Sequence, residues 1–229
     1  MSVVLVTGAA SGIGGAVASS LRDNGWTVAG LDLQPAAGVA LALTADVSDP
    51  AAVAAAVRAV REGLGPIDAL VTAAGHYEML PVSEISPESW HRMLRVHLGG
   101  LRNCLSVVLP DMLDRGRGSV VAVTSELAIG GGDGDAHYAA AKGAIIGLVR
   151  SLATEVAPRG VRVNAVAPGP TDTPLLSPDS PWRDREFLAT VPNRRLTRPD
   201  EIAAVVRFLL DEGNFCIGEV ISPNGGVVI

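Results

Sequence analysis

Apolar, β-branched runs alternate with helical patterns along the whole chain, and this alternation limits the possible folds more than any other feature. It predicts strands at Val3–Val6, Thr27–Leu31, Ala40–Leu43, Ile67–Val71, Ser119–Val123, Arg162–Val166 and Glu219–Ser222. It predicts helices over Ile13–Asp23, Pro50–Arg61, Pro87–Met112, His137–Val156 and Pro199–Leu210. Strands that alternate with helices form a parallel sheet with helices on both faces. Because the crossovers are right-handed, we expect a doubly wound α/β sheet of about seven strands.

No linker or change of composition divides the chain, so residues 1–229 are predicted to form one domain. A chain of this length can bury a substantial single core. Residues 168–192 contain six prolines, and their apolar residues follow neither a helix nor a strand period. Such a long loop inside a compact domain is usually functional or mobile. We expect residues 168–192 to form a substrate-binding loop.

Charge and composition exclude several classes of function. The formal net charge is −6, which argues against a nucleic-acid partner. No uncharged apolar run approaches the length of a membrane span, and no basic segment precedes Val3–Val6 as a signal peptide requires. Cys104 and Cys216 are too few for a disulfide framework, which favours reduced thiols. We expect a soluble, cytoplasmic protein with no membrane partner.

A glycine-rich turn follows the first predicted strand, with the sequence T-G-A-A-S-G-I-G over residues 7–14. Glycines at a strand-to-helix junction let the backbone approach a pyrophosphate at the positive end of the helix dipole. The spacing is one residue wider than G-x-G-x-x-G, and simple strand-to-helix packing is the alternative. The position favours a Rossmann-type dinucleotide site. The residues expected to contact the cofactor here are Gly8, Ser11, Gly12, Ile13 and Gly14.

Asp32 closes the second predicted strand, where a carboxylate can accept both ribose hydroxyls of an adenosine and repel a 2′-phosphate. Its neighbours Ser11 and Leu33 are not basic, so NAD is the expected cofactor. Alternatively, Asp32 is a turn residue before Pro35.

Two further turns follow the third and fourth strands, and the carboxyl ends of parallel strands line the ligand crevice. We therefore expect Asp46, Val47, Ala74 and Gly75 to contact the cofactor. Asp46 is suited to the adenine amino group, although it could equally cap the following helix.

Tyr138 and Lys142 are four residues apart in a predicted helix, so they share one helix face. An ammonium beside a phenol favours the phenolate, and an unperturbed tyrosine pKa of about 10 is too high for proton exchange at neutral pH. Y-x-x-x-K alone is weak evidence, and Ser125 alone could be a strand-end hydroxyl bonded to its own backbone. The surrounding motifs give the three residues their significance.

Together these residues resemble the short-chain dehydrogenase/reductase superfamily over essentially the whole chain. The motifs that carry the resemblance are T-G-A-A-S-G-I-G, Asp46-Val47, Ala73–Gly75, Ser125 with Y-A-A-A-K, R-V-N-A-V-A-P-G-P-T-D-T over Arg162–Thr173, R-P-D-E-I-A and a late N-G-G. The resemblance implies hydride transfer between a nicotinamide and a substrate carbinol or carbonyl carbon.

The resemblance also implies a role for each site residue. Tyr138 would exchange the substrate proton, and Ser125 would hydrogen-bond the substrate oxygen. Lys142 would bind the nicotinamide ribose and lower the tyrosine pKa. Tyr138 and Lys142 thus count among the cofactor contacts, as do Pro168, Gly169, Thr171 and Thr173 around the carboxamide.

The chain departs from the family pattern at three places. His97 replaces an asparagine credited with holding a helix kink; it could keep that role, join a proton relay, or be a satisfied interior histidine. Thr72 and Ala73 replace two asparagines of N-N-A-G, in a turn whose contacts are largely main-chain. Glu126 replaces a small or apolar residue, and could bind a substrate hydroxyl or amine or point to solvent.

No catalytic metal is expected. The run Gly130–Asp135 could suggest a calcium loop, but with Asp133 as the first position the twelfth, which requires a glutamate, is Ala144. His76, His91 and His137 form no set with ligand spacing.

The sequence therefore predicts an NAD-dependent enzyme that interconverts a secondary alcohol and a ketone. A 3-oxoacyl thioester reductase and a cyclic dihydrodiol dehydrogenase are alternatives within the family, and a catalytically silent NAD-binding sensor is the alternative outside enzymes.

An apolar pocket cover is expected from Leu175, Leu176, Trp182, Phe187 and Leu188, while Arg183, Arg185, Arg194 and Arg195 could meet an anionic carrier or lie in solvent. By analogy with the family we expect a homo-oligomer, dimer or tetramer, formed through the two long helices.

Overall fold

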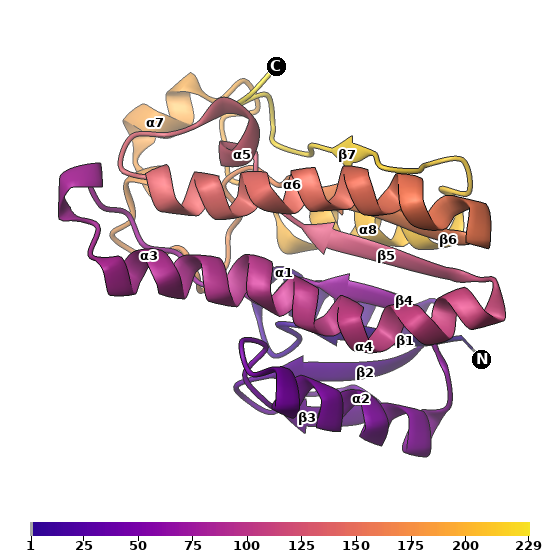
Figure 1. The fold of residues 1–229 in the computed structure, drawn as a ribbon. Helices are drawn as coiled ribbons and strands as arrows, with labels where there is room; N and C mark the ends of the chain where they lie inside the picture. Colours follow the sequence, from indigo (N-terminus) through magenta and orange to yellow (C-terminus); the bar gives the residue numbers. More distant parts are fainter. Residues whose placement is uncertain (1) are drawn as a thin grey trace.

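One parallel sheet runs through the structure, a computed structural model that describes residues 2–229 (Figure 1). Its seven strands lie in the order β3-β2-β1-β4-β5-β6-β7, and every neighbouring pair is parallel. The strands are β1 (Val3–Thr7), β2 (Thr27–Asp32), β3 (Leu41–Thr44), β4 (Ile67–Thr72), β5 (Gly118–Val123), β6 (Val161–Val166) and β7 (Val220–Ile221). The expected doubly wound α/β fold is confirmed.

Helices cover both faces of the sheet (Figure 1). The helices are α1 (Gly12–Asp23), α2 (Pro50–Leu64), α3 (Pro87–Leu94), α4 (Gly100–Arg115), α5 (Leu127–Gly130), α6 (Ala136–Val156), α7 (Arg185–Thr190) and α8 (Pro199–Asp211). One core cluster joins α2, α4 and α6 to the sheet, and a second joins α1 and α8 to the opposite face. Among residues 2–229 no helix has the length and apolarity needed to cross a lipid bilayer.

The two cores follow from the alternation of side chains along each strand. On β1, Val3 and Leu5 belong to the cluster under α2, α4 and α6, whereas Val4 and Val6 belong to the cluster under α1 and α8. All four side chains are buried. Fully burying one such side chain contributes about 1.5–3 kcal/mol, so a strand apolar on both faces fixes the central position of β1.

The strand order reverses beside β1, and this reversal locates the site. The chain builds β1, β2 and β3 toward one edge, then returns to place β4 on the other side of β1. In open α/β sheets, ligands bind outside the carboxyl ends of the strands at such a switch point. Thr7 at the end of β1 is paired with Leu31 on one side and Thr72 on the other.

Three local predictions need correction. The helix expected over Pro87–Met112 is interrupted by a wide π turn at Arg95–Gly99, where the buried His97 ring bonds the His76 backbone. Residues 168–192 are not wholly irregular, because they contain a 3₁₀ turn at Pro181–Arg183 and the short helix α7. The last strand is shorter than expected, since Ser222 already turns its hydroxyl to the carbonyl of Ala167.

Candidate active site

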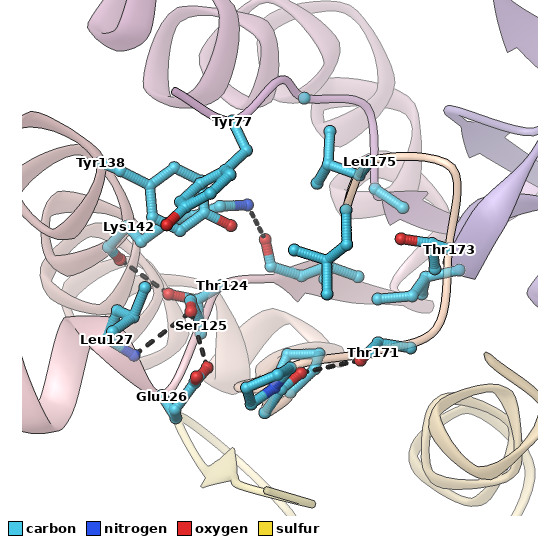
Figure 2. A pocket seen from close by; sticks show the side chains of 18 of the residues that line it. Tyr77, Thr124, Ser125, Glu126, Leu127, Tyr138, Lys142, Thr171, Thr173 and Leu175 are labelled. Carbon is cyan, nitrogen blue, oxygen red and sulfur yellow. Dashed lines mark hydrogen bonds between the residues drawn. The ribbon is translucent and has the colours of Figure 1, made fainter. Parts of the chain in front are cut away.

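Ser125, Tyr138 and Lys142 are buried and line one cavity (Figure 2). Ser125 follows the end of β5, and the other two side chains lie on one face of α6. The Lys142 Nζ atom is 5.6 Å from the centre of the Tyr138 ring and donates a hydrogen bond of 2.9 Å to the carbonyl oxygen of Val123. Thr124 Oγ1 donates to the backbone carbonyl of Lys142, which ties α6 to β5 at this point.

The protein groups around Tyr138 do not by themselves lower its pKa. Burial raises the pKa of Tyr138, and the carboxyl group of Glu126 adds to that shift. Burial also lowers the pKa of Lys142 to about 7, so the amine loses much of the charge that was expected to act on the phenol. Desolvation disfavours the charged form of both groups, which is why an i, i+4 pair alone does not predict a phenolate.

Glu126 does not point to solvent, as one alternative allowed. Its side chain is 3% exposed and lines the same cavity. Ser125 Oγ donates to Glu126 Oε2 at 2.8 Å and accepts from the Leu127 backbone N–H at 3.2 Å. Burial raises the pKa of Glu126 to about 7.

His97 lies in the π turn and contacts the loop after β4. Its Nε2 lies 2.8 Å from the His76 carbonyl oxygen and 3.3 Å from the His76 backbone nitrogen, while Nδ1 is buried without a hydrogen-bond partner among residues 2–229. Burial and the charge of Lys142 hold the pKa of His97 well below its usual value, so the ring is neutral. The ring meets the Tyr138 ring edge to face, with 5.5 Å between their centres. A relay role for His97 stays a prediction.

Tyr77 is a cavity residue that the sequence did not reveal. Its hydroxyl donates to Asp135 Oδ1 at 2.7 Å and accepts from Trp182 Nε1 at 2.9 Å. Its ring meets the Tyr138 ring edge to face at 5.1 Å. These contacts connect the loop after β4, the start of α6 and the segment 168–192. An aromatic residue in an aperiodic loop carries no sequence signal for such a role.

The predicted cofactor contacts divide between two adjoining hollows. A groove at the carboxyl ends of β1, β2 and β4 is lined by Gly8, Ser11, Gly12, Ile13, Gly14, Asp32, Asp46, Val47, Ala74, Gly75 and Thr173. The cavity of Tyr138 is lined by Pro168, Gly169 and Thr171. Ile13, Ala73, Gly75, Thr173 and Leu175 line both hollows.

The glycine turn fits a dinucleotide. Gly8 has φ +71°, and a Cβ there would lie 2.8 Å from the Ala74 nitrogen. A Cβ on Gly14 would lie 2.1 Å from the Gly8 carbonyl oxygen, so the start of α1 packs directly on the turn. Backbone N–H groups at the start of a helix and a groove free of side chains are what a pyrophosphate needs.

Asp32 combines the two roles considered for it. Its carboxylate accepts from the Ala10 and Gln34 backbone N–H groups, at 3.0 Å and 3.1 Å, and it also lines the groove. Asp49, rather than Asp46, caps α2 by accepting from Ala51 and Ala52. Asp46 lines the groove and accepts from the Ser48 backbone N–H.

Two arginines at the groove were not foreseen. Arg92 of α3 and Arg95 of the π turn line it, in a stretch for which the sequence predicts one uninterrupted helix. They add positive charge to the groove.

The segment 168–192 covers the cavity with apolar side chains. Leu175, Leu176 and Trp182 line it, as expected, while Phe187 packs edge to face on Trp182 at 4.8 Å instead. Arg183 is held within the segment by a 2.8 Å ion pair with Asp172, and its guanidinium group also donates to the backbone carbonyl groups of residues 173, 176 and 177. Within residues 2–229, no three His, Cys, Asp or Glu side chains gather as a metal ion would require.

Comparisons with known proteins place this geometry in context. A family model described as enoyl-(acyl carrier protein) reductase matches residues 8–228. A 3-oxoacyl-(acyl-carrier-protein) reductase of Thermotoga maritima is 36% identical, with 99% of this chain and 98% of that protein covered. A cis-4-hydroxycyclohexanecarboxylate dehydrogenase of Sinomonas cyclohexanicum is 37% identical, covering 98% of this chain and 95% of that one. The solved aldohexose dehydrogenase of Thermoplasma acidophilum superimposes with a TM-score of 0.91 at 30% identity, covering 99% and 93% of the two chains.

Proposed function

Because the chain belongs to the short-chain dehydrogenase/reductase superfamily, we propose that it interconverts a secondary alcohol and a ketone with NAD(H), using Ser125, Tyr138 and Lys142. One observation carries the proposal: these three side chains line a cavity that shares its wall with the groove of the glycine turn. When bound, the nicotinamide supplies or accepts the hydride. The protein's own residues then handle the substrate oxygen and its proton.

Tyr138 is the proton-exchanging group. In the direction of ketone reduction its hydroxyl gives a proton to the substrate oxygen, and in alcohol oxidation the phenolate takes that proton back. The Ser125 hydroxyl stabilises the charge that develops on the same oxygen. Lys142, held at the Val123 carbonyl, faces the Tyr138 ring and would bind the nicotinamide ribose. Pro168, Gly169, Thr171 and Thr173 would hold the carboxamide.

Asp32 supports NAD over NADP. Two backbone N–H groups hold the Asp32 carboxylate in place in the groove, and negative charge there repels a 2′-phosphate. Arg92 and Arg95 also line the groove and are suited to the pyrophosphate charge. The proposed preference for NAD thus depends on the repulsion between the Asp32 carboxylate and a 2′-phosphate.

A compact secondary alcohol, cyclic or short, suits the cavity best. Its walls carry the apolar side chains of Leu127, Leu175 and Trp182. Two of the four arginines that could meet an acidic carrier protein are engaged elsewhere, since Arg183 pairs with Asp172 and Arg195 with Glu201. The dehydrogenase of a cyclic hydroxy acid among the relatives supports this class.

Reduction of a 3-oxoacyl thioester is the second candidate. It is supported by the relatives named as 3-oxoacyl-(acyl-carrier-protein) reductases and acetoacetyl-CoA reductases, which match along nearly the whole chain. Arg185 and Arg194 remain available for an acidic partner, because no ion pair to them forms among residues 2–229.

We further propose a single domain over residues 1–229 and a homo-oligomer built on the outer face of α4 and α6. An apolar hollow between these helices is lined by the half-buried leucines Leu109, Leu113, Leu148 and Leu152. Arg102 and Glu155 lie at its rim, so a second copy in an antiparallel arrangement would bring opposite charges together.

The proposed function is tested by following NADH absorbance with a panel of cyclic alcohols, short secondary alcohols and 3-oxoacyl thioesters, with NAD and NADP in parallel. Turnover that depends on Tyr138 and prefers NAD supports it. NAD binding without turnover across the panel would instead indicate a sensor.

A further inference from the structure

The hydrogen bond between Ser125 and Glu126 decides what the serine can do. The Glu126 backbone N–H donates to the Pro168 carbonyl at 3.0 Å, so the residue is fixed between the ends of β5 and β6. Figure 2 shows the carboxyl group turned toward the Ser125 hydroxyl. The geometry leaves the carboxyl group buried and in contact with the residue that should meet the substrate oxygen.

No cation neutralises this carboxyl group. No ion pair to Glu126 forms among residues 2–229. The titratable groups that face it are Asp135, Tyr138 and Lys142 from the α6 side and Tyr77 and His97 across the cavity. Asp135 adds negative charge, and Lys142 is bonded to the Val123 carbonyl instead. A buried, unpaired carboxyl group tends to hold its proton, because burying an isolated charge is unfavourable.

The Ser125 hydroxyl can donate one hydrogen bond, and the protonation state of Glu126 determines which group accepts it. An ionised carboxylate only accepts hydrogen bonds, so Glu126 accepts the one hydrogen bond that the Ser125 hydroxyl can donate, while the Leu127 N–H donates to Ser125 Oγ. The hydroxyl then has no proton left for a substrate oxygen. A protonated carboxyl group reverses the bond: Glu126 donates to Ser125 Oγ, and the Ser125 proton is free to turn into the cavity.

We propose that Glu126 is a positioning residue that directs the Ser125 hydroxyl, and that its protonated form is the one in which Ser125 donates to the substrate oxygen. The inference rests on the proposed function. Glu126 keeps its proton through the cycle: the proton gained by the substrate oxygen in reduction comes from Tyr138, and the hydride comes from the dihydronicotinamide. The carboxyl group only sets the direction of one hydrogen bond.

The pH dependence of kcat/KM for ketone reduction tests this assignment. With the pKa of Glu126 raised to about 7, the activity of the unmodified enzyme should fall as pH rises through neutrality. E126Q has a neutral carboxamide whose N–H donates to Ser125 Oγ at every pH, so the fall near neutrality should disappear and activity should persist to higher pH. D133N, which removes an exposed carboxylate nearby, should keep the original profile. An E126Q profile that matches the unmodified one overturns the proposal.

A second measurement does not depend on turnover. Infrared spectra of the ligand-free protein should contain the band of a protonated carboxylic acid that disappears as pH rises through neutrality and is missing in E126Q. If the band titrates although no substrate of the panel reacts, Glu126 holds its proton as proposed and it is the proposed function that fails. If Glu126 is already ionised well below neutral pH, the assignment is wrong whatever the activity.

Discussion

The Lys142 ammonium nitrogen lies 5.6 Å from the centre of the Tyr138 ring, yet burial keeps the phenol neutral. The same burial lowers the pKa of Lys142 to about 7. Neither side chain is therefore held firmly in its charged form. Further positive charge in the groove would be needed to lower the pKa of the phenol. The proton chemistry of Tyr138 is expected to respond to the cofactor, not to Lys142 alone.

Replacing Tyr138 by Phe removes the proton-exchanging hydroxyl and keeps the ring contacts with Tyr77 and His97. Turnover should fall by at least about 10²-fold, the usual contribution of a general acid or base. NADH binding, measured by its fluorescence, should be retained because the groove is unchanged. Turnover close to that of the unmodified enzyme would refute the assignment of Tyr138.

Replacing Asp32 by Ala removes the carboxylate from the groove. NAD should bind more weakly and the ratio of kcat/KM for NAD over NADP should fall, because the repulsion of a 2′-phosphate is lost. Asp49→Ala is a suitable control, since Asp49 caps α2 without lining the groove. An unchanged cofactor ratio in D32A would show that Asp32 acts only through its bonds to Ala10 and Gln34.

The free energy of unfolding of E126Q should exceed that of the unmodified protein above neutral pH. The folded-state pKa of Glu126 is raised from 4.5 to about 7, so between these values the folded protein binds more protons and its stability falls as pH rises. One pKa unit corresponds to about 1.4 kcal/mol, so removing the buried charge should contribute on the order of 3 kcal/mol at high pH. Below the unfolded pKa the difference should vanish. Urea denaturation at several pH values measures it, and an equal difference at every pH would contradict this account.

Replacing Tyr77 by Phe removes the hydroxyl that joins Asp135 to Trp182. The buried Asp135 carboxyl group then loses the hydrogen bond from Tyr77, and leaving such a group unsatisfied lowers stability by about 1–3 kcal/mol. Trp182 should also be less well held, which should raise KM more than it lowers kcat. W182F is the matched control, because it removes one bond and leaves Tyr77 on Asp135. Equal stabilities for Y77F and the unmodified protein would mean that this network has no role.

Replacing Leu152 by Glu places a charge in the apolar hollow between α4 and α6. If a second copy covers this face, the variant should dissociate, and light scattering should give the mass of a monomer. Ser151→Glu, at the exposed edge of the same hollow, is expected to have a weaker effect. An unmodified protein that is monomeric at micromolar concentration would contradict the proposed assembly.

The sequence predicted the order of strands and helices because that order depends on the local alternation of apolar residues. Through its resemblance to the family it also predicted that Ser125, Tyr138 and Lys142 would act together, and the three side chains line one cavity. It did not predict the neutral state of Tyr138, because burial depends on segments far away in the chain. It placed neither Tyr77 nor Arg95 at the site, as their positions depend on a loop and a π turn without a sequence pattern.

Because of the π turn at Arg95–Gly99, the direction in which His97 points depends on the number of residues in this segment. A wide turn accommodates one extra residue, and each residue of a regular helix advances the chain by about 100°. A chain with one residue deleted here could form an uninterrupted helix, and the imidazole of His97 would then rotate away from the His76 carbonyl and the Tyr138 ring. Deletions in this segment should therefore be tolerated far less well than substitutions.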